Sequence, residues 1–156
     1  MESTLNRTRK AALVIATGFG AGYFPRAPGT AGAVVGLPLG WGLSFLSPHT
    51  SLFILAMLTF LAFWASGVTE RVLKKKDPSI VVIDEVIGMA VSMWNIEPAW
   101  SSIIALFFLF RLFDIWKPFP VKNMENLFKG GAGIVMDDVA AGIYANIFWR
   151  IGSSFF

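Results

Sequence analysis

Long apolar segments separated by short polar breaks limit the fold of this chain more than any other feature. They cover residues 31–46, 52–68, 80–94, 99–113 and 139–156. These runs are long and lack the alternation of a half-buried strand, so the fold class is predicted to be all-α. A membrane span needs about 20 residues, and several segments reach that length only with their flanks. The pattern predicts a polytopic helical membrane protein of about five spans, folded as one domain over residues 1–156.

Composition favours lipid as the solvent of these helices. Hydrophobic residues make up 55% of the chain and charged residues 15%, whereas a soluble domain has about 45–50% and about 25%. A soluble bundle of unusually apolar helices, docked on a membrane, is the alternative. The run 11–24 is shorter and contains Gly18, Gly20 and Gly22, which predicts a half-inserted or interfacial element before the first span.

The basic residues indicate an orientation. With a cytoplasmic N-terminus, twelve of the thirteen Lys and Arg residues fall on or near the inner side, and Arg150 is the exception. The outer breaks at 47–50 and 95–98 contain no Lys or Arg, in agreement with the positive-inside rule. A multi-pass protein of the bacterial cytoplasmic membrane is therefore predicted. The net charge is only +3, and the basic residues do not alternate with exposed aromatics, which disfavours nucleic acid as a partner.

The chain has no cysteine, and its one histidine, His49, lies in an outer break. The missing thiols exclude disulfides, thiolate nucleophiles and thiolate metal sites. Any chemistry that needs an imidazole would depend on His49 alone. The functional groups are therefore expected among the carboxylates, Lys and Arg.

Carboxylates within apolar sequence are the strongest functional signal. Asp84 and Glu85 interrupt the apolar stretch 80–88, where an ionised side chain is costly and by default marks function. Asp77-Pro78 has the pattern of a helix start, which would put both acids about two turns inside the helix. The structural alternative is a carboxylate that only pairs with a basic residue of the fourth segment.

Arg111 and Asp114 lie three residues apart, hence on one helix face near the inner end of the fourth segment. Lys117 ends that helix, because the following Pro118 disfavours helical geometry at the residue before it. This presents the Lys117 ammonium group at the membrane interface. An Arg111–Asp114 helix pair beside a snorkelling Lys117 is the structural alternative.

Asp137 and Asp138 open the last apolar segment, after the glycine-rich residues 130–133. Helix capping is the structural alternative for this pair. With the predicted orientation, all three acidic groups lie toward the cytoplasmic side, and five carboxylates could not all stay ionised close together without cations. Oxygen-only ligands suit Mg²⁺ or Mn²⁺, and the neighbouring Arg and Lys suit phosphate. A divalent cation and a phosphate group are the predicted ligands.

The loop before the first span is rich in Gly and Pro and supplies a further candidate anion site. Thr30 is a candidate N-cap, the amides around Gly29 open the helix, and Arg26 adds positive charge. Backbone amides at a helix start bind anions. The loop does not match a P-loop, and glycine-mediated helix packing is an equally good explanation of its glycines.

Four motifs, taken together and in order, resemble the phosphatidylglycerophosphatase A family. The resemblance covers roughly residues 17–142, and its four matching pieces are GFGAGYFPRAPGT at 18–30, VIDEVIG at 82–88, FRLFDIWKPFP at 110–120 and GGAGIVMDD at 130–138.

The resemblance implies a Mg²⁺-dependent phosphatase that converts phosphatidylglycerophosphate to phosphatidylglycerol at the cytoplasmic face of the membrane. It also implies that the catalytic and metal-binding residues are Asp84, Glu85, Asp114, Asp137 and Asp138, with Arg111 and Lys117 alongside them. We favour metal-activated water as the nucleophile, because the Asp-x-Asp pattern of aspartyl-phosphate enzymes is missing.

Two other functions compete with a phosphatase. A small ion or metal carrier could use intramembrane acids, but carriers place their acids near the midplane. A Mg²⁺-dependent phosphotransferase would need several Asp at helical spacing in one motif, whereas the acids here form adjacent pairs on separate helices. The expected partners are the phospholipid substrate and membrane lipid, and the sequence does not specify an oligomeric state.

Overall fold

The computed structural model describes residues 2–119 and 121–155, and every element within them is helical. Pro120 and Phe156, which end the third motif and the last predicted segment, lie outside the described residues. The all-α prediction is confirmed. The elements are α1 (Glu2–Ala16), the 3₁₀ turn η1 (Ala21–Tyr23), α2 (Pro28–Leu43), α3 (Pro48–Leu73), α4 (Ile83–Ser92), α5 (Trp100–Trp116), α6 (Val121–Leu127) and α7 (Gly131–Ser153).

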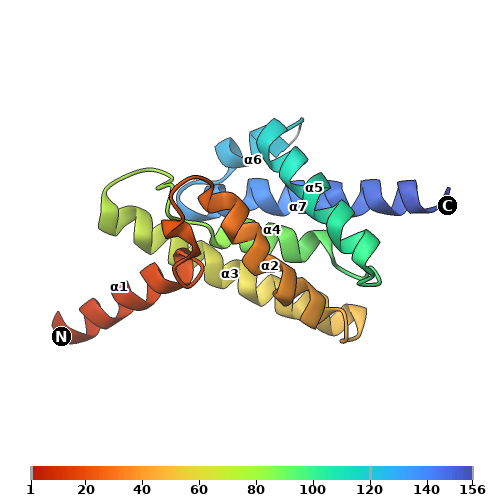
Figure 1. Ribbon diagram of the computed structural model, residues 1–156. Coiled ribbons are helices and arrows are strands. Elements are labelled where there is room, and N and C mark those ends of the chain that lie inside the picture. The colour runs from red at the N-terminus through yellow and green to blue at the C-terminus, as the bar shows by residue number, and fades with distance from the viewer. Residues whose placement is uncertain (1, 120, 156) are drawn as a thin grey trace.

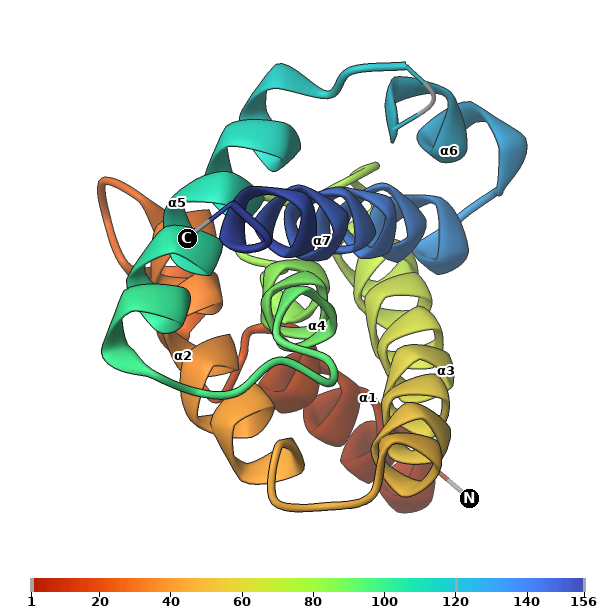
Figure 2. The same cartoon turned by 90° about the vertical axis from the view of Figure 1, so that its right-hand side faces the viewer.

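The short helix α4 is the centre of the fold. Figure 2 shows it enclosed by α2, α3, α5 and α7, with α1 beneath. Eight of its ten residues are buried, and Val86, Ile87 and Met89 join the two main hydrophobic clusters. A helix of ten residues is about 15 Å long, about half the hydrocarbon thickness of a bilayer. The predicted span 80–94 is therefore wrong as a continuous membrane helix.

Glycines allow the helices around α4 to approach it closely. A β-carbon at Gly88 would lie 2.6 Å from the Phe110 ring and 2.7 Å from the Asp138 carbonyl oxygen, so α4 meets both α5 and α7 there. In α2, a β-carbon at Gly36 would lie 2.6 Å from the Val86 carbonyl oxygen. Small residues at such crossings let backbones touch, as in membrane helix pairs. The crossings fix the ends of α4 and α7 that carry the acidic residues.

The prediction of about five spans is not confirmed. Within the described residues, α3 is the one helix that is long and apolar enough to cross a membrane by itself. The predicted half-inserted element at 11–24 is a helix end followed by tight turns. Its first six residues, 11–16, belong to α1, and the chain then turns through Gly18 and Gly20, whose φ angles of 55° and 101° suit glycine.

Arg150, the exception to the charge pattern, has a structural role at the end of the fold away from Asp84. Its guanidinium donates hydrogen bonds to the carbonyl oxygens of Trp94 and Asn95, at 3.1 and 2.8 Å, and to Asn146 Oδ1 at 2.8 Å. These bonds tie α7 to the loop between α4 and α5. In Figure 1 this end of α7 runs toward the C-terminus, on the opposite side of the fold from the N-terminus.

Candidate active site

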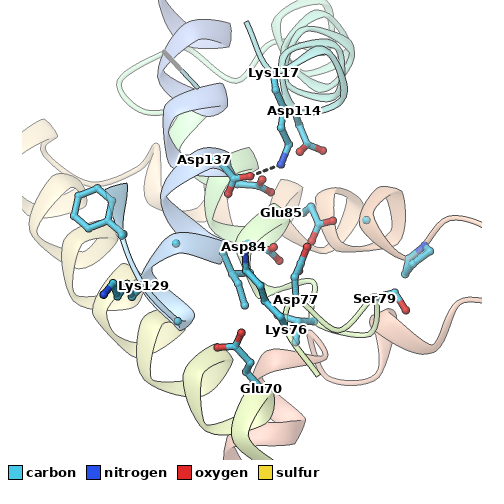
Figure 3. A pocket seen from close by; sticks show the side chains of 18 residues that line it. Glu70, Lys76, Asp77, Ser79, Asp84, Glu85, Asp114, Lys117, Lys129 and Asp137 are labelled. Carbon is cyan, nitrogen blue, oxygen red and sulfur yellow. Dashed lines mark hydrogen bonds and ion pairs between the residues drawn. The ribbon is translucent and has the colours of Figure 1, made fainter. Parts of the chain in front are cut away.

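The first turn of α4 carries Asp84 and Glu85. The predicted helix start at Asp77-Pro78 is wrong, and so is the expectation that the two acids lie two turns inside. The chain before the helix is held away from helical geometry, because the Val82 amide donates to the Ala16 carbonyl oxygen at 2.8 Å. Asp84 is buried. At this position both side chains face the end of the fold where α5 ends and α7 begins (Figure 3).

Asp137 and Asp138 lie in the second turn of α7, because that helix begins at Gly131. The expectation that they open the helix is wrong, and helix capping does not explain them. Both are buried, with 4% and 3% of their surface exposed. Burial raises the pKa of both carboxyl groups, and for Asp138 the nearby charge of Asp114 adds to the rise.

The end of α5 brings positive charge to the acids. Arg111 pairs with Asp114 on the same helix face, as the i,i+3 spacing predicts. Lys117 is the C-cap of α5, with a left-handed φ of 47°, and pairs with Asp137 of α7. Burial alone lowers the pKa of Lys117, but the hydrogen bond and charge of Asp137 outweigh it and raise the pKa overall. Lys117 therefore stays protonated and links α5 to α7.

Three carboxylates meet closely enough to hold one cation. Asp84, Glu85 and Asp138 each offer an oxygen, and these atoms lie within 4.8 Å of one another. Opposite ligands of an octahedral Mg²⁺ stand about 4.2 Å apart at the usual bond length. The buried oxygens Asp84 Oδ1, Glu85 Oε2 and Asp138 Oδ2 have no hydrogen-bond partner within the described residues. Buried oxygens are rarely left unpaired, so this donor set fits a hard divalent cation.

Of the three residues predicted as an anion site around the start of α2, one contributes directly. Gly29 lines the pocket, and a β-carbon there would overlap Glu85 and lie 3.2 Å from Arg111 Nη1. Gly29 thus leaves room for two functional side chains. Arg26 is exposed, and neither Arg26 nor Thr30 is among the described residues that line the pocket. Thr30 is not the N-cap either, since α2 begins at Pro28 after Ala27.

The acids open into a cavity of about 550 Å³, within the range of about 300–1,000 Å³ typical of ligand pockets. Sequence analysis missed the half of it formed by the end of α3 and by two loops. Its residues there include Glu70, Lys76, Asp77, Ser79 and Lys129. Asp77 has a left-handed φ of 45°, a costly geometry for a residue other than glycine. The polar loop between two apolar segments on the inner side was the available signal.

An all-helical fold that gathers buried carboxylates and basic side chains in one polar pocket is an arrangement expected of a helical enzyme that acts on phosphate esters. Comparison with known proteins identifies the family: the sequence profile of phosphatidylglycerophosphatase A matches residues 14–153. The chain therefore belongs to the phosphatidylglycerophosphatase A family, whose members are phosphoric monoester hydrolases of bacterial membranes. No solved structure matches the chain.

Three relatives extend over most of the chain. A putative phosphatidylinositol-3-phosphatase of Bacteroides thetaiotaomicron is 42% identical, over 90% of this chain and 95% of its own length. Phosphatidylglycerophosphatase A of Haemophilus influenzae is 38% identical, over 86% of this chain and 83% of its own length. Phosphatidylglycerophosphatase A of Escherichia coli is 30% identical, over 89% of this chain and 82% of its own length. The chain therefore resembles whole proteins rather than a part of them.

Proposed function

We propose that this protein hydrolyses phosphatidylglycerophosphate to phosphatidylglycerol and phosphate, with a divalent cation, at the cytoplasmic face of the membrane. The observation that carries the proposal is the group of unpaired buried oxygens on Asp84, Glu85 and Asp138. They lie beside Lys117, in a pocket large enough for a phosphate ester. Mg²⁺ fits these oxygen donors, and Mn²⁺ has the same preference.

Asp84, Glu85 and Asp138 would hold the cation, with Asp114 and Asp137 beside them. A divalent cation held there would neutralise charge at the phosphoryl group and lower the pKa of water, which is the chemistry that a water nucleophile needs. A carboxylate of the group accepts the proton of the attacking water. Lys117 and Arg111 neutralise charge on the phosphoryl oxygens, and their ion pairs with Asp137 and Asp114 hold them in position.

Exposed apolar side chains support a membrane location. Phe53 and Phe60 of α3, Phe108 of α5 and Ile147 of α7 are each about half exposed or more. Large exposed apolar side chains on three helices suit a lipid environment. Trp41 and Trp100 project at the end away from the acids and Trp116 at the acidic end, as in the aromatic belts of membrane proteins. We infer that α3 crosses the bilayer and that the acidic end faces the cytoplasm.

The cysteine-free sequence makes this orientation testable. A Lys75→Cys variant should react with a membrane-impermeant maleimide only after spheroplasts are lysed, whereas Ser47→Cys should react while they are intact. The reverse labelling pattern would overturn the orientation. A carrier function is disfavoured by the same geometry, because the acids lie at one end of the fold rather than near its middle.

A second substrate is favoured by one relative. The Bacteroides relative, named a putative phosphatidylinositol-3-phosphatase, is the most similar of the three above, so phosphatidylinositol 3-phosphate is the alternative lipid. Purified protein should be assayed for phosphate release from both lipids in mixed micelles with Mg²⁺. Faster release from phosphatidylglycerophosphate supports the proposal. Release from the inositol lipid alone would show a phosphatase with phosphatidylinositol 3-phosphate as its substrate. Release from neither lipid would overturn both the phosphatase activity and the proposed substrate.

A further inference from the structure

The cavity beside the acidic residues is larger than a phosphoryl group requires. A phosphate and a cation with a few waters, at about 30 Å³ a water, fill well under half of its 550 Å³. Figure 3 shows the residues that surround the remaining space: Lys117 and Asp114 lie at the top of the view, and Glu70 lies at the bottom. We call the part lined by Glu70, Lys76, Asp77, Ser79 and Lys129 the outer arm.

The lining of the outer arm determines what it can bind. An acyl chain would need mainly apolar walls, but these five side chains are charged or hydroxylated. The cavity also has one aromatic wall residue beside Lys129, Phe128. Lys76 and Lys129 are exposed cations that suit an anionic oxygen. Glu70, Asp77 and Ser79 carry oxygens that accept hydrogen bonds from alcohol hydroxyls. The combination suits a polar alcohol that also carries a negative charge.

We propose that the outer arm binds the alcohol side of the headgroup, with Lys76 and Lys129 on the phosphodiester anion and the acidic side chains on the glycerol hydroxyl. This inference rests on the proposed function and deepens it, because it names the residues that select the headgroup. A phosphatidylglycerophosphate headgroup has two phosphates joined by glycerol. The terminal monoester then lies at the carboxylates and the diester in the outer arm.

Backbone geometry supports a binding role for the loop at 74–79. Asp77 is held in the left-handed region, with a φ of 45°, and it lines the same cavity as Asp84. In Figure 3 Asp77 extends from the loop toward Glu85. Strained non-glycine residues are retained where the surrounding structure uses them. We assign the glycerol hydroxyl to Asp77, because Asp77 lines the cavity together with Lys76 and Asp84.

Two soluble inhibitors separate the two ends of the cavity. Inorganic phosphate resembles the product at the carboxylates, and glycerophosphoglycerol carries the diester and glycerol but no monoester. Phosphate release from phosphatidylglycerophosphate is measured for wild type, for the double variant Lys76→Met with Lys129→Met, and for Lys75→Met. Lys75 is the matched control, an exposed neighbour that does not line the cavity.

The double variant should raise the inhibition constant of glycerophosphoglycerol by about tenfold or more, the effect of losing charge-assisted hydrogen bonds. Its inhibition constant for inorganic phosphate should stay within about twofold of the wild-type value, and Lys75→Met should change neither. Suppose that the wild type is active, but that the double variant has the wild-type inhibition constants for both inhibitors or raises both equally. That result overturns this inference and leaves the proposed function standing. A wild type that releases no phosphate overturns the proposed function and the inference with it.

Discussion

Gly88 lies one turn after Asp84, where α4 crosses α7, and we predict that Gly88→Ala separates the carboxylates of the two helices. The added β-carbon would stand 2.7 Å from the Asp138 carbonyl oxygen and 2.6 Å from the Phe110 ring. Ordinary van der Waals contact begins at 3.4 Å. The Asp138 backbone must therefore move away from α4 by about 0.7 Å, the difference between these two distances. This shift moves the Asp138 carboxylate, a proposed cation ligand, away from Asp84 and Glu85.

The size of the effect follows from this overlap. Overpacking a tight contact lowers the folding stability by about 1–3 kcal/mol. Replacing glycine by alanine inside a helix raises it by up to about 1 kcal/mol. The net loss of folding free energy is then about 0–3 kcal/mol. Activity should suffer more, because a displacement near 1 Å at catalytic groups can cost about a hundredfold. We expect turnover to fall roughly tenfold to a hundredfold.

Gly152→Ala is the matched control, because Gly152 lies on α7 and a β-carbon there meets nothing within 4 Å. The assay is Mg²⁺-dependent phosphate release at saturating lipid, alongside thermal unfolding in the same detergent. Gly152→Ala should retain wild-type turnover, with a stability equal to that of wild type or up to about 1 kcal/mol higher. If Gly88→Ala matched this control in both measurements, the close crossing of α4 and α7 would not position the site.

Asp138→Asn should lower turnover by about a hundredfold or more while keeping the unfolding temperature, because burial already favours an uncharged side chain there; full activity would remove Asp138 from the site. Without metal, the unfolding temperature should fall as pH rises from 4 to 8, since the raised pKa values of Asp137 and Asp138 mean that ionisation destabilises the fold. Mg²⁺ should reverse this trend, and a thermal scan without that reversal contradicts metal binding. Arg150→Leu should lower the unfolding temperature but leave the Mg²⁺ concentration at half-maximal activity unchanged, since its bonds to Trp94 and Asn95 lie at the other end of the fold.

The helical class and the acidic residues could be predicted from the sequence because both depend on local pattern. Long apolar runs without alternation indicate helices whatever surrounds them, and Asp84 within apolar sequence marks a costly burial. The pairing of Arg111 with Asp114 follows from helical spacing alone. Each of these inferences needs only residues close together in the chain.

The start of α4 could not be predicted, because contacts distant in sequence decide it. The Val82 amide bonds the Ala16 carbonyl oxygen, and Gly22 packs against the Ile80 backbone, so that the helix begins at Ile83. The lack of a side chain at Gly22 is essential to this contact. For the same reason the outer arm of the cavity was not predicted: it forms where the loop at 74–79 meets the start of α7.

Span number depends on length as well as apolarity. The segment 80–94 has the hydropathy of a membrane helix. Its helix, α4, is only ten residues long and is buried by the neighbouring helices. A buried core helix and a lipid-exposed one have the same composition, and only the surrounding helices distinguish them. The sequence therefore located the apolar segments, but it could not show that the one at 80–94 contains a helix of only ten residues.

Metal-dependent release of phosphate tests the central claim most directly. Purified protein in mixed micelles of phosphatidylglycerophosphate is assayed with Mg²⁺, then with excess EDTA, and then with Mg²⁺ restored above the chelator. The carboxylate site predicts release with Mg²⁺, loss of release in EDTA and recovery on restoration. Equal release in all three conditions would contradict a cation held by Asp84, Glu85 and Asp138.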